Sequence, residues 1–158
     1  MSDGEHDRQM AFVERVALMY ERNGLPRIAG RILGWLLICD PPAQTAGELA
    51  TALDVSKGSI STMTRMLITL GLIEHTSKRG DRRDYFHIPP HLWMDVLRKQ
   101  FAQLAVFRQL AESGLETLKD SPAASRDRLE VMRDLYGFFE RELPSLIERW
   151  EAEQREQP

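Results

Sequence analysis

Helix start and stop signals follow one another closely between residues 45 and 71, and this stretch restricts the possible folds more than any other. Thr45 and Glu48 fit a capping box, in which the hydroxyl caps a new helix and the carboxylate reaches back to its start. The helix that they open is short and ends near Leu53. Asp54 then predicts a tight turn, because aspartate is one of the few residues that tolerate left-handed backbone geometry. The stretch therefore predicts a short helix followed at once by a second one.

The second helix begins at Ser56, a good capping residue, and runs to Leu70 before Gly71 stops it. At about 3.6 residues per turn, its apolar residues share one side, which we expect to face the core. These residues are Ile60, Met63, Leu67 and Leu70. The opposite side is small, polar, lightly basic and without an acidic residue, and it carries Lys57, Gly58, Ser59, Ser61, Thr62, Arg65 and Thr69.

This polar face is suited to the major groove of DNA. Small side chains let a helix lie deeply in the groove, and Ser and Thr hydroxyls can bind bases or phosphates. Arg65 could reach a guanine edge or a phosphate, and the N–H groups at the helix start add an anion site. A short helix, a tight turn and such a second helix form a helix-turn-helix. The alternative is that residues 57–69 are only a solvated helix face.

The hydrophobic period changes after Gly71, where residues 72–77 and 84–88 are short β-prone runs on either side of the turn KRGDRR. Four cations gather there in a chain whose net charge is −3, and they are Lys78, Arg79, Arg82 and Arg83. The tip of such a hairpin can enter a minor groove or lie along phosphates. Asp81 is expected to hold a neighbouring arginine, for example Arg83, in a fixed pose. The alternative is a solvated loop with scattered charges.

Helices are expected on both sides of this region, over residues 8–22, 26–39, 91–118 and 124–154. Pro144 lies inside the last of them and predicts a kink or a restart. The two C-terminal helices carry long apolar stripes, with Trp93, Leu97, Leu104, Phe107, Ala111, Leu115 and Leu118 on the first and Leu129, Met132, Tyr136, Phe139, Leu143, Ile147 and Trp150 on the second. These stripes hold more apolar surface than a small hairpin domain needs to cover. We therefore expect them to dimerise, with folding back inside one chain as the alternative.

The predicted fold is mostly helical (α+β): a winged helix-turn-helix with a two-stranded wing hairpin, between N- and C-terminal dimerisation helices. The length of 158 residues suffices for a small domain with extra helices. We expect a dimerisation helix over residues 1–24, the DNA-binding domain over residues 25–90 and a helical dimerisation region over residues 91–158.

Two segments resemble a known family. The first, TAGELATALDVSKGSISTMTRMLITLGLIEHTSKRGDRRDYF, resembles the winged helix-turn-helix of MarR-type transcriptional regulators, and the second, GLPRIAGRILGWLLICDPP, is similar to the branch typified by GbsR. The resemblance covers residues 10–90. It implies a homodimer with interlocking terminal helices, a recognition helix over Ser56–Thr69 and a wing over His75–His87. The family's Asp-x-Arg wing signature maps to Asp81 and Arg83, but its Leu-Thr after the second strand is absent, which leaves the end of that strand open.

The resemblance also implies a small-molecule effector, bound between the wing domain and the dimer helices. The residues that could line such a pocket are Trp35, Tyr85, Trp93 and Met94. Each of them could equally be a core residue. The GbsR branch is associated with choline, but no aromatic cage is evident in the sequence, so that ligand is not carried over.

Other kinds of site find little support. Cys39 lies in an apolar stretch and is expected to be a small core residue rather than a redox sensor. His87 and His91 are separated by two prolines, so one helix does not present both, and no metal or cofactor is expected. No nucleophile motif, phosphate loop or dinucleotide fingerprint is present, which argues against an enzyme. No apolar run is long enough to span a membrane, and the polar N-terminus suggests a cytoplasmic protein.

The sequence therefore predicts a DNA-binding transcriptional regulator, specifically a repressor, that acts as a homodimer on double-stranded DNA. The operator would be pseudo-palindromic, and a small-molecule effector could release the protein from it. The alternative is a winged-helix module that docks onto an acidic protein without specific DNA binding. Binding that depends on salt and on DNA sequence would separate the two.

Overall fold

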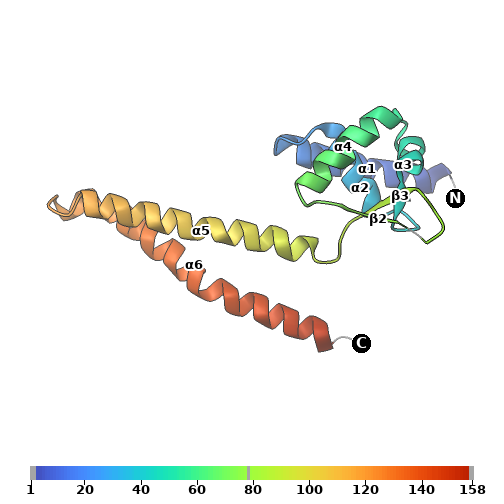
Figure 1. The fold of residues 1–158 in the computed structure, drawn as a ribbon. Coiled ribbons are helices and arrows are strands. Elements are labelled where there is room, and N and C mark those ends of the chain that lie inside the picture. Colours follow the sequence, from blue (N-terminus) through green and yellow to red (C-terminus); the bar gives the residue numbers. More distant parts are fainter. Residues whose placement is uncertain (1–2, 78, 157–158) are drawn as a thin grey trace. The chain divides into compact units, whose positions relative to one another are not determined.

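The computed structural model describes residues 3–77 and 79–156. The chain is mostly helical with one small antiparallel sheet (Figure 1). It divides into two compact units, residues 1–92 and residues 93–158. The first contains helices α1 to α4 and the sheet, and the second contains nearly all of the two long helices α5 and α6.

The first two helices, α1 (Asp3–Arg22) and α2 (Arg27–Leu36), pack tightly against each other. Val13 and Ala17 of α1 are fully buried at this contact. The sequence predicts that α1 begins at residue 8, but the helix begins earlier, at Asp3. Its first turns are polar, so they contain no apolar residues from which helical spacing could be recognised. The expected end of α2 at residue 39 was late, since the helix gives way to a turn after Leu36.

Helices α3 (Ala46–Leu53) and α4 (Lys57–Thr69) form the helix-turn-helix that the sequence predicts. The capping box at the start of α3 is confirmed: the Thr45 hydroxyl accepts a hydrogen bond from Glu48 N at 3.2 Å, and Thr45 N donates to Glu48 Oε2 at 2.6 Å. Asp54 has a φ of 50°, so the left-handed turn is confirmed as well. The Ser56 hydroxyl caps α4 by accepting from Ser59 N at 3.2 Å.

The buried side of α4 differs in part from the prediction. Ile60 and Leu67 are fully buried, but Leu70 lies at the helix end and is 46% exposed. Thr64 is buried as well, although its side chain is polar. Its hydroxyl donates to the Ile60 carbonyl oxygen at 2.9 Å, and this local hydrogen bond removes the cost of burying the group.

The sheet has three strands, one more than expected. Strand β3 (Asp84–His87) lies between β2 (Glu74–Ser77) and the two-residue β1 (Gln44–Thr45), and both pairings are antiparallel. The hairpin of β2 and β3 is therefore confirmed, and β1 ties it to the start of α3. Phe86 on β3 belongs to the core shared with α2, α3 and α4.

In the second unit, α5 (Leu92–Thr117) and α6 (Ala123–Glu156) follow each other after a short turn (Figure 1). Phe107 stacks on Tyr136 with ring centroids 4.9 Å apart, and Arg108 forms an ion pair with Glu140. Helix α6 continues through Pro144, so the restart that this proline suggested does not occur. Among the helices of residues 3–77 and 79–156, none is both long and apolar enough to cross a membrane.

Candidate nucleic-acid interface

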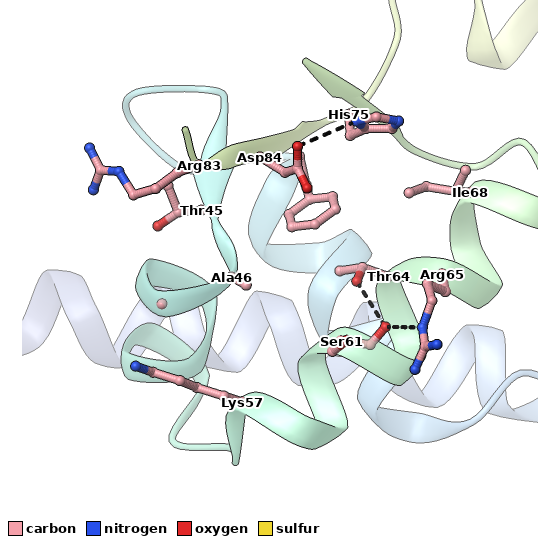
Figure 2. A pocket seen from close by; sticks show the side chains of 12 residues that line it. Thr45, Ala46, Lys57, Ser61, Thr64, Arg65, Ile68, His75, Arg83 and Asp84 are labelled. Carbon is pink, nitrogen blue, oxygen red and sulfur yellow. Dashed lines mark hydrogen bonds and ion pairs between the residues drawn. The ribbon is translucent and has the colours of Figure 1, made fainter. Parts of the chain in front are cut away.

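The polar face of α4 and the small sheet border a shared open cleft of about 680 Å³ (Figure 2). Helix α4 contributes Lys57, Ser61, Thr64, Arg65 and Ile68 to its lining. Residues of the sheet, of the wing turn and of the start of α3 complete it, namely Thr45, Ala46, Gly47, His75, Arg83, Asp84 and Phe86. The cleft therefore joins the predicted recognition helix to the predicted wing.

The hydroxyl groups on α4 have a defined orientation. Thr62 Oγ1 donates to the Gly58 carbonyl oxygen at 3.1 Å, and Thr69 Oγ1 donates to the Arg65 carbonyl oxygen at 2.9 Å. Because each hydroxyl proton is directed to the backbone, each oxygen retains lone pairs with which it can accept a hydrogen bond from a ligand. This part of the helix surface therefore offers acceptors, with Lys57 and Arg65 as donors.

All of the predicted α4 residues lie on the helix surface, and all but one are exposed. Lys57, Gly58, Ser61, Thr62 and Arg65 are exposed, whereas Ser59 is half-buried. The Ser59 hydroxyl lies 2.9 Å from that of Ser56, within the cap of the helix. Arg65 Nε donates to the Ser61 carbonyl oxygen at 3.2 Å (Figure 2). This hydrogen bond holds the Nε end of the guanidinium against the backbone of α4.

The wing turn presents its arginines to solvent. Gly80 has a φ of 85°, a conformation that glycine adopts without strain, and it allows the chain to reverse direction there. Arg79 and Arg82 are exposed, and within residues 3–77 and 79–156 no ion pair holds either of them. Lys78, which the sequence also singles out, lies outside the described residues.

Asp81 and Arg83 form the ion pair that the sequence predicts. Arg83 Nε donates to both carboxylate oxygens at 3.0 Å, Arg83 Nη2 donates to Oδ2 at 2.6 Å, and the backbone N of Arg83 donates to Oδ1 at 2.9 Å. These hydrogen bonds hold the pKa of the Asp81 carboxyl well below its usual range, and they raise the pKa of Arg83. Tyr85 takes part too, since its hydroxyl donates to Asp81 Oδ2 at 2.8 Å. The sequence pattern carries no signal for this third partner.

Histidines and acids also meet on the sheet. His75 Nδ1 lies 3.8 Å from Asp84 Oδ1 at the edge of the cleft (Figure 2), and Glu74 lies within 3.8 Å of His87 and 3.6 Å of His91. The His75–Asp84 and Glu74–His87 pairs join neighbouring strands, whereas His91 lies just before α5, so the sequence alone does not reveal these contacts. In the part of the chain that the structure describes, no group of three such residues is arranged to hold a metal ion.

The four residues proposed for an effector pocket have different surroundings. Tyr85 is buried, with its hydroxyl on Asp81, and Trp35 lines another open cleft together with Gln44. Trp93 and Met94 belong to the second unit. The effector pocket therefore stays a prediction.

Cys39 is half-buried and packs against the core. Burial raises the pKa of its thiol, so the thiol form is favoured over the reactive thiolate.

Comparisons with known proteins agree with this architecture. A sequence model described as MmpR5-like MarR family transcriptional regulator matches residues 91–153, and one described as MarR family matches residues 23–84. The HTH-type transcriptional regulator MmpR5 of Mycobacterium tuberculosis is 43% identical over 141 residues, which cover 89% of this chain and 86% of that protein. The putative HTH-type transcriptional regulator YvaV of Bacillus subtilis is 30% identical over 77 residues, 49% of this chain and 43% of that protein.

A solved structure is similar as well. A crystal structure of a transcriptional regulator is 42% identical with a TM-score of 0.67, over 92% of this chain and 99% of that one. Its fold and the long match to MmpR5 cover the helix-turn-helix, the wing and the C-terminal helices together. This chain belongs to the MarR family of winged-helix transcriptional regulators.

Proposed function

We propose that the chain is a homodimeric repressor that binds a pseudo-palindromic operator through α4 and the wing, His75–His87. The observation that carries this proposal is the exposed polar face of α4, which has no acidic residue and borders the same cleft as the wing. In a chain with 24 acidic and 21 basic side chains, such a face is suited to a polyanion.

In this proposal α4 lies in the major groove. Arg65 would donate to a guanine edge or to a phosphate, and the Thr62 hydroxyl would accept from the amino group of a cytosine or an adenine. Lys57 and the N-terminal N–H groups of α4 would hold a phosphate, which positions the helix without reading sequence.

The wing would contact the adjacent minor groove. Arg79 and Arg82 extend from the turn into solvent, and the negative potential of a narrow minor groove attracts such side chains. Lys78 and Arg83 are the other predicted contacts in this turn. These wing contacts would add to the affinity and favour sequences with a narrow groove.

Support for a homodimer comes from the apolar side chains that α5 and α6 leave exposed in the single chain. They include Trp93, Leu97, Val106, Phe107, Leu110, Val131, Leu135, Phe138, Phe139, Leu146 and Trp150. Exposed apolar surface of this extent marks an interaction site. A two-fold axis between two copies would place the two α4 helices about one turn of DNA apart, roughly 10 bp.

A small-molecule effector would release the operator by favouring a different spacing of the two α4 helices. A ligand shifts such an equilibrium only by its difference in affinity for the two states. Trp35, Tyr85, Trp93 and Met94 remain the predicted lining of its pocket. Membership of the GbsR-type branch and a cytoplasmic location also stay predictions.

Selection from a pool of random DNA duplexes tests the proposal. The wild-type chain should enrich a sequence with two inverted half-sites whose centres lie about 10 bp apart. Enrichment of a single half-site would argue against the symmetric dimer. If no sequence is enriched and the protein binds all duplexes equally weakly, the winged-helix module that docks onto an acidic protein becomes the better account.

A further inference from the structure

We propose that Tyr85 is a positioning residue, which holds Arg83 of the wing in the orientation that meets DNA. This inference rests on the proposed function, because it assigns a role within the same DNA-binding surface. It goes beyond the Asp-x-Arg pair, since it adds a buried group from the central strand to the pair at the turn.

The geometry joins three side chains. The Tyr85 hydroxyl donates to Asp81 Oδ2 at 2.8 Å and accepts from Arg83 Nη2 at 2.9 Å, while Arg83 Nη2 also donates to Asp81 Oδ2 at 2.6 Å. Each side chain is thus bonded to the other two. The Arg83 guanidinium carbon also lies 5.6 Å from the centre of the Tyr85 ring, within the range of a cation–π interaction.

Tyr85 differs from its two partners in how firmly it is held. Its residue is only 5% exposed, and its backbone pairs with Thr45 of β1 on one side and Thr76 of β2 on the other. The Arg83 side chain, in contrast, is 63% exposed. The Asp81 side chain is 25% exposed, but it lies in the turn, and an ion pair to a solvent-exposed arginine contributes little order by itself. The buried ring therefore supplies the fixed point for the pair.

Two consequences follow for DNA binding. Arg83 uses Nε and Nη2 within the wing, which leaves Nη1 as the end that can meet a phosphate or a base edge. The side chain is already ordered before DNA arrives, so binding loses less conformational entropy. The charge of Arg83 also offsets that of Asp81, which would otherwise repel the phosphates.

The first test is a double-mutant cycle with Tyr85→Phe and Arg83→Ala on the duplex selected by the wild-type chain. Tyr85→Phe keeps the buried ring and removes only the hydroxyl. We expect it to raise the Kd about three- to tenfold, which corresponds to the net contribution of one typical intramolecular hydrogen bond. In the Arg83→Ala background the same change should have almost no effect, because the residue that Tyr85 positions is gone.

Tyr20→Phe is the matched control, since Tyr20 lies in the same unit on α1 and partly packs against the core. It should leave the Kd unchanged in both backgrounds. Equal losses from Tyr85→Phe with and without Arg83 would overturn the positioning role, and so would wild-type affinity in Tyr85→Phe.

A second measurement needs no DNA and separates this inference from the proposed function. In ¹⁵N NMR spectra, the Arg83 Nε–H of the wild-type chain should give a resolved, slowly exchanging signal, because both of its carboxylate contacts are ordered. In Tyr85→Phe it should broaden or exchange faster. If the wild type selects no duplex, the proposed function fails, while this signal still decides whether Tyr85 orders Arg83. An Arg83 signal that is unchanged in Tyr85→Phe would refute that ordering.

Discussion

Gly30 of α2 lies so close to Ala17 of α1 that a Cβ on Gly30 would stand 2.7 Å from the Ala17 Cα. The obstacle is backbone, so the two helices would have to move apart. We predict that Gly30→Ala destabilises the chain by about 1–3 kcal/mol, the usual cost of overpacking a core. Thermal unfolding followed by circular dichroism would measure this as a lower melting temperature.

Gly4→Ala is the control for this change, because a Cβ on Gly4 of α1 would meet no atom of the described residues within 4 Å. It should leave the melting temperature unchanged or raise it slightly, since alanine favours helices. Equal melting temperatures for Gly30→Ala and the wild type would show that the helices are not packed as closely as described.

Loss of the capping box should also destabilise the helix-turn-helix. Thr45→Ala removes the hydroxyl that accepts from Glu48 N, and we expect it to lower the free energy of unfolding by about 1–2 kcal/mol. Thr51→Ala is the matched control in α3, because among the described residues its hydroxyl donates only to the Gly47 carbonyl oxygen, and no cap is lost. Urea unfolding should place the control within about 0.5 kcal/mol of the wild type. Similar losses in both variants would speak against a special role for the cap.

Local signals explain which parts of the fold are predictable from the sequence. The cap at Thr45, the left-handed turn at Asp54 and the reversal at Gly80 each depend on one or two neighbouring residues, and all three are found where the sequence places them. Strand β1 escaped prediction because its two residues pair with β3, some forty positions further along the chain. A two-residue strand has no alternation from which it could be recognised.

In the candidate site too, some features are predictable from local sequence and others depend on the folded structure. The polar face of α4 follows from helical periodicity, so its exposed residues could be named in advance. The acceptor role of the Thr62 hydroxyl depends on a hydrogen bond to Gly58 that only the structure reveals. Tyr85 is one of several aromatic residues in the sequence. Its hydrogen bond to Asp81 is evident only in the structure, where strand β3 fixes the direction of the Tyr85 side chain.

Alkaline titration should identify Tyr85 by its late ionisation. Its hydrogen bond to Asp81 raises the pKa of the Tyr85 hydroxyl, because the neutral form donates that bond. The contribution of this hydrogen bond to the stability of the fold is complete below the unfolded-state tyrosine pKa of about 10. It is lost as the pH rises through the higher pKa of Tyr85 in the folded chain. Burial raises the pKa of Tyr20 as well, so absorbance at the tyrosinate band should contain a late component that is smaller in Tyr85→Phe than in the wild type. A late step of equal size in both proteins would contradict the assignment.

Cys39 should react slowly with thiol reagents. Burial raises the pKa of its thiol, so at pH 8 the folded chain holds less thiolate than the unfolded chain does. Reaction with a chromogenic disulfide should be slower in buffer than in concentrated guanidinium chloride, where the same cysteine is exposed. Faster reaction in the folded chain would instead support a redox-sensing role.

The central claim is that α4 binds DNA with sequence preference, and fluorescence anisotropy across a salt series tests it most directly. Wild type, Arg65→Ala and Arg128→Ala would be titrated with the selected duplex and a scrambled one. Arg128 is an exposed arginine of α6 and serves as the matched control. We predict a steep salt dependence and a clear preference for the selected duplex in the wild type. Arg65→Ala should lose about 1–3 kcal/mol of binding free energy, and Arg128→Ala should behave like the wild type. Equal, weak binding of both duplexes by all three proteins would contradict the claim.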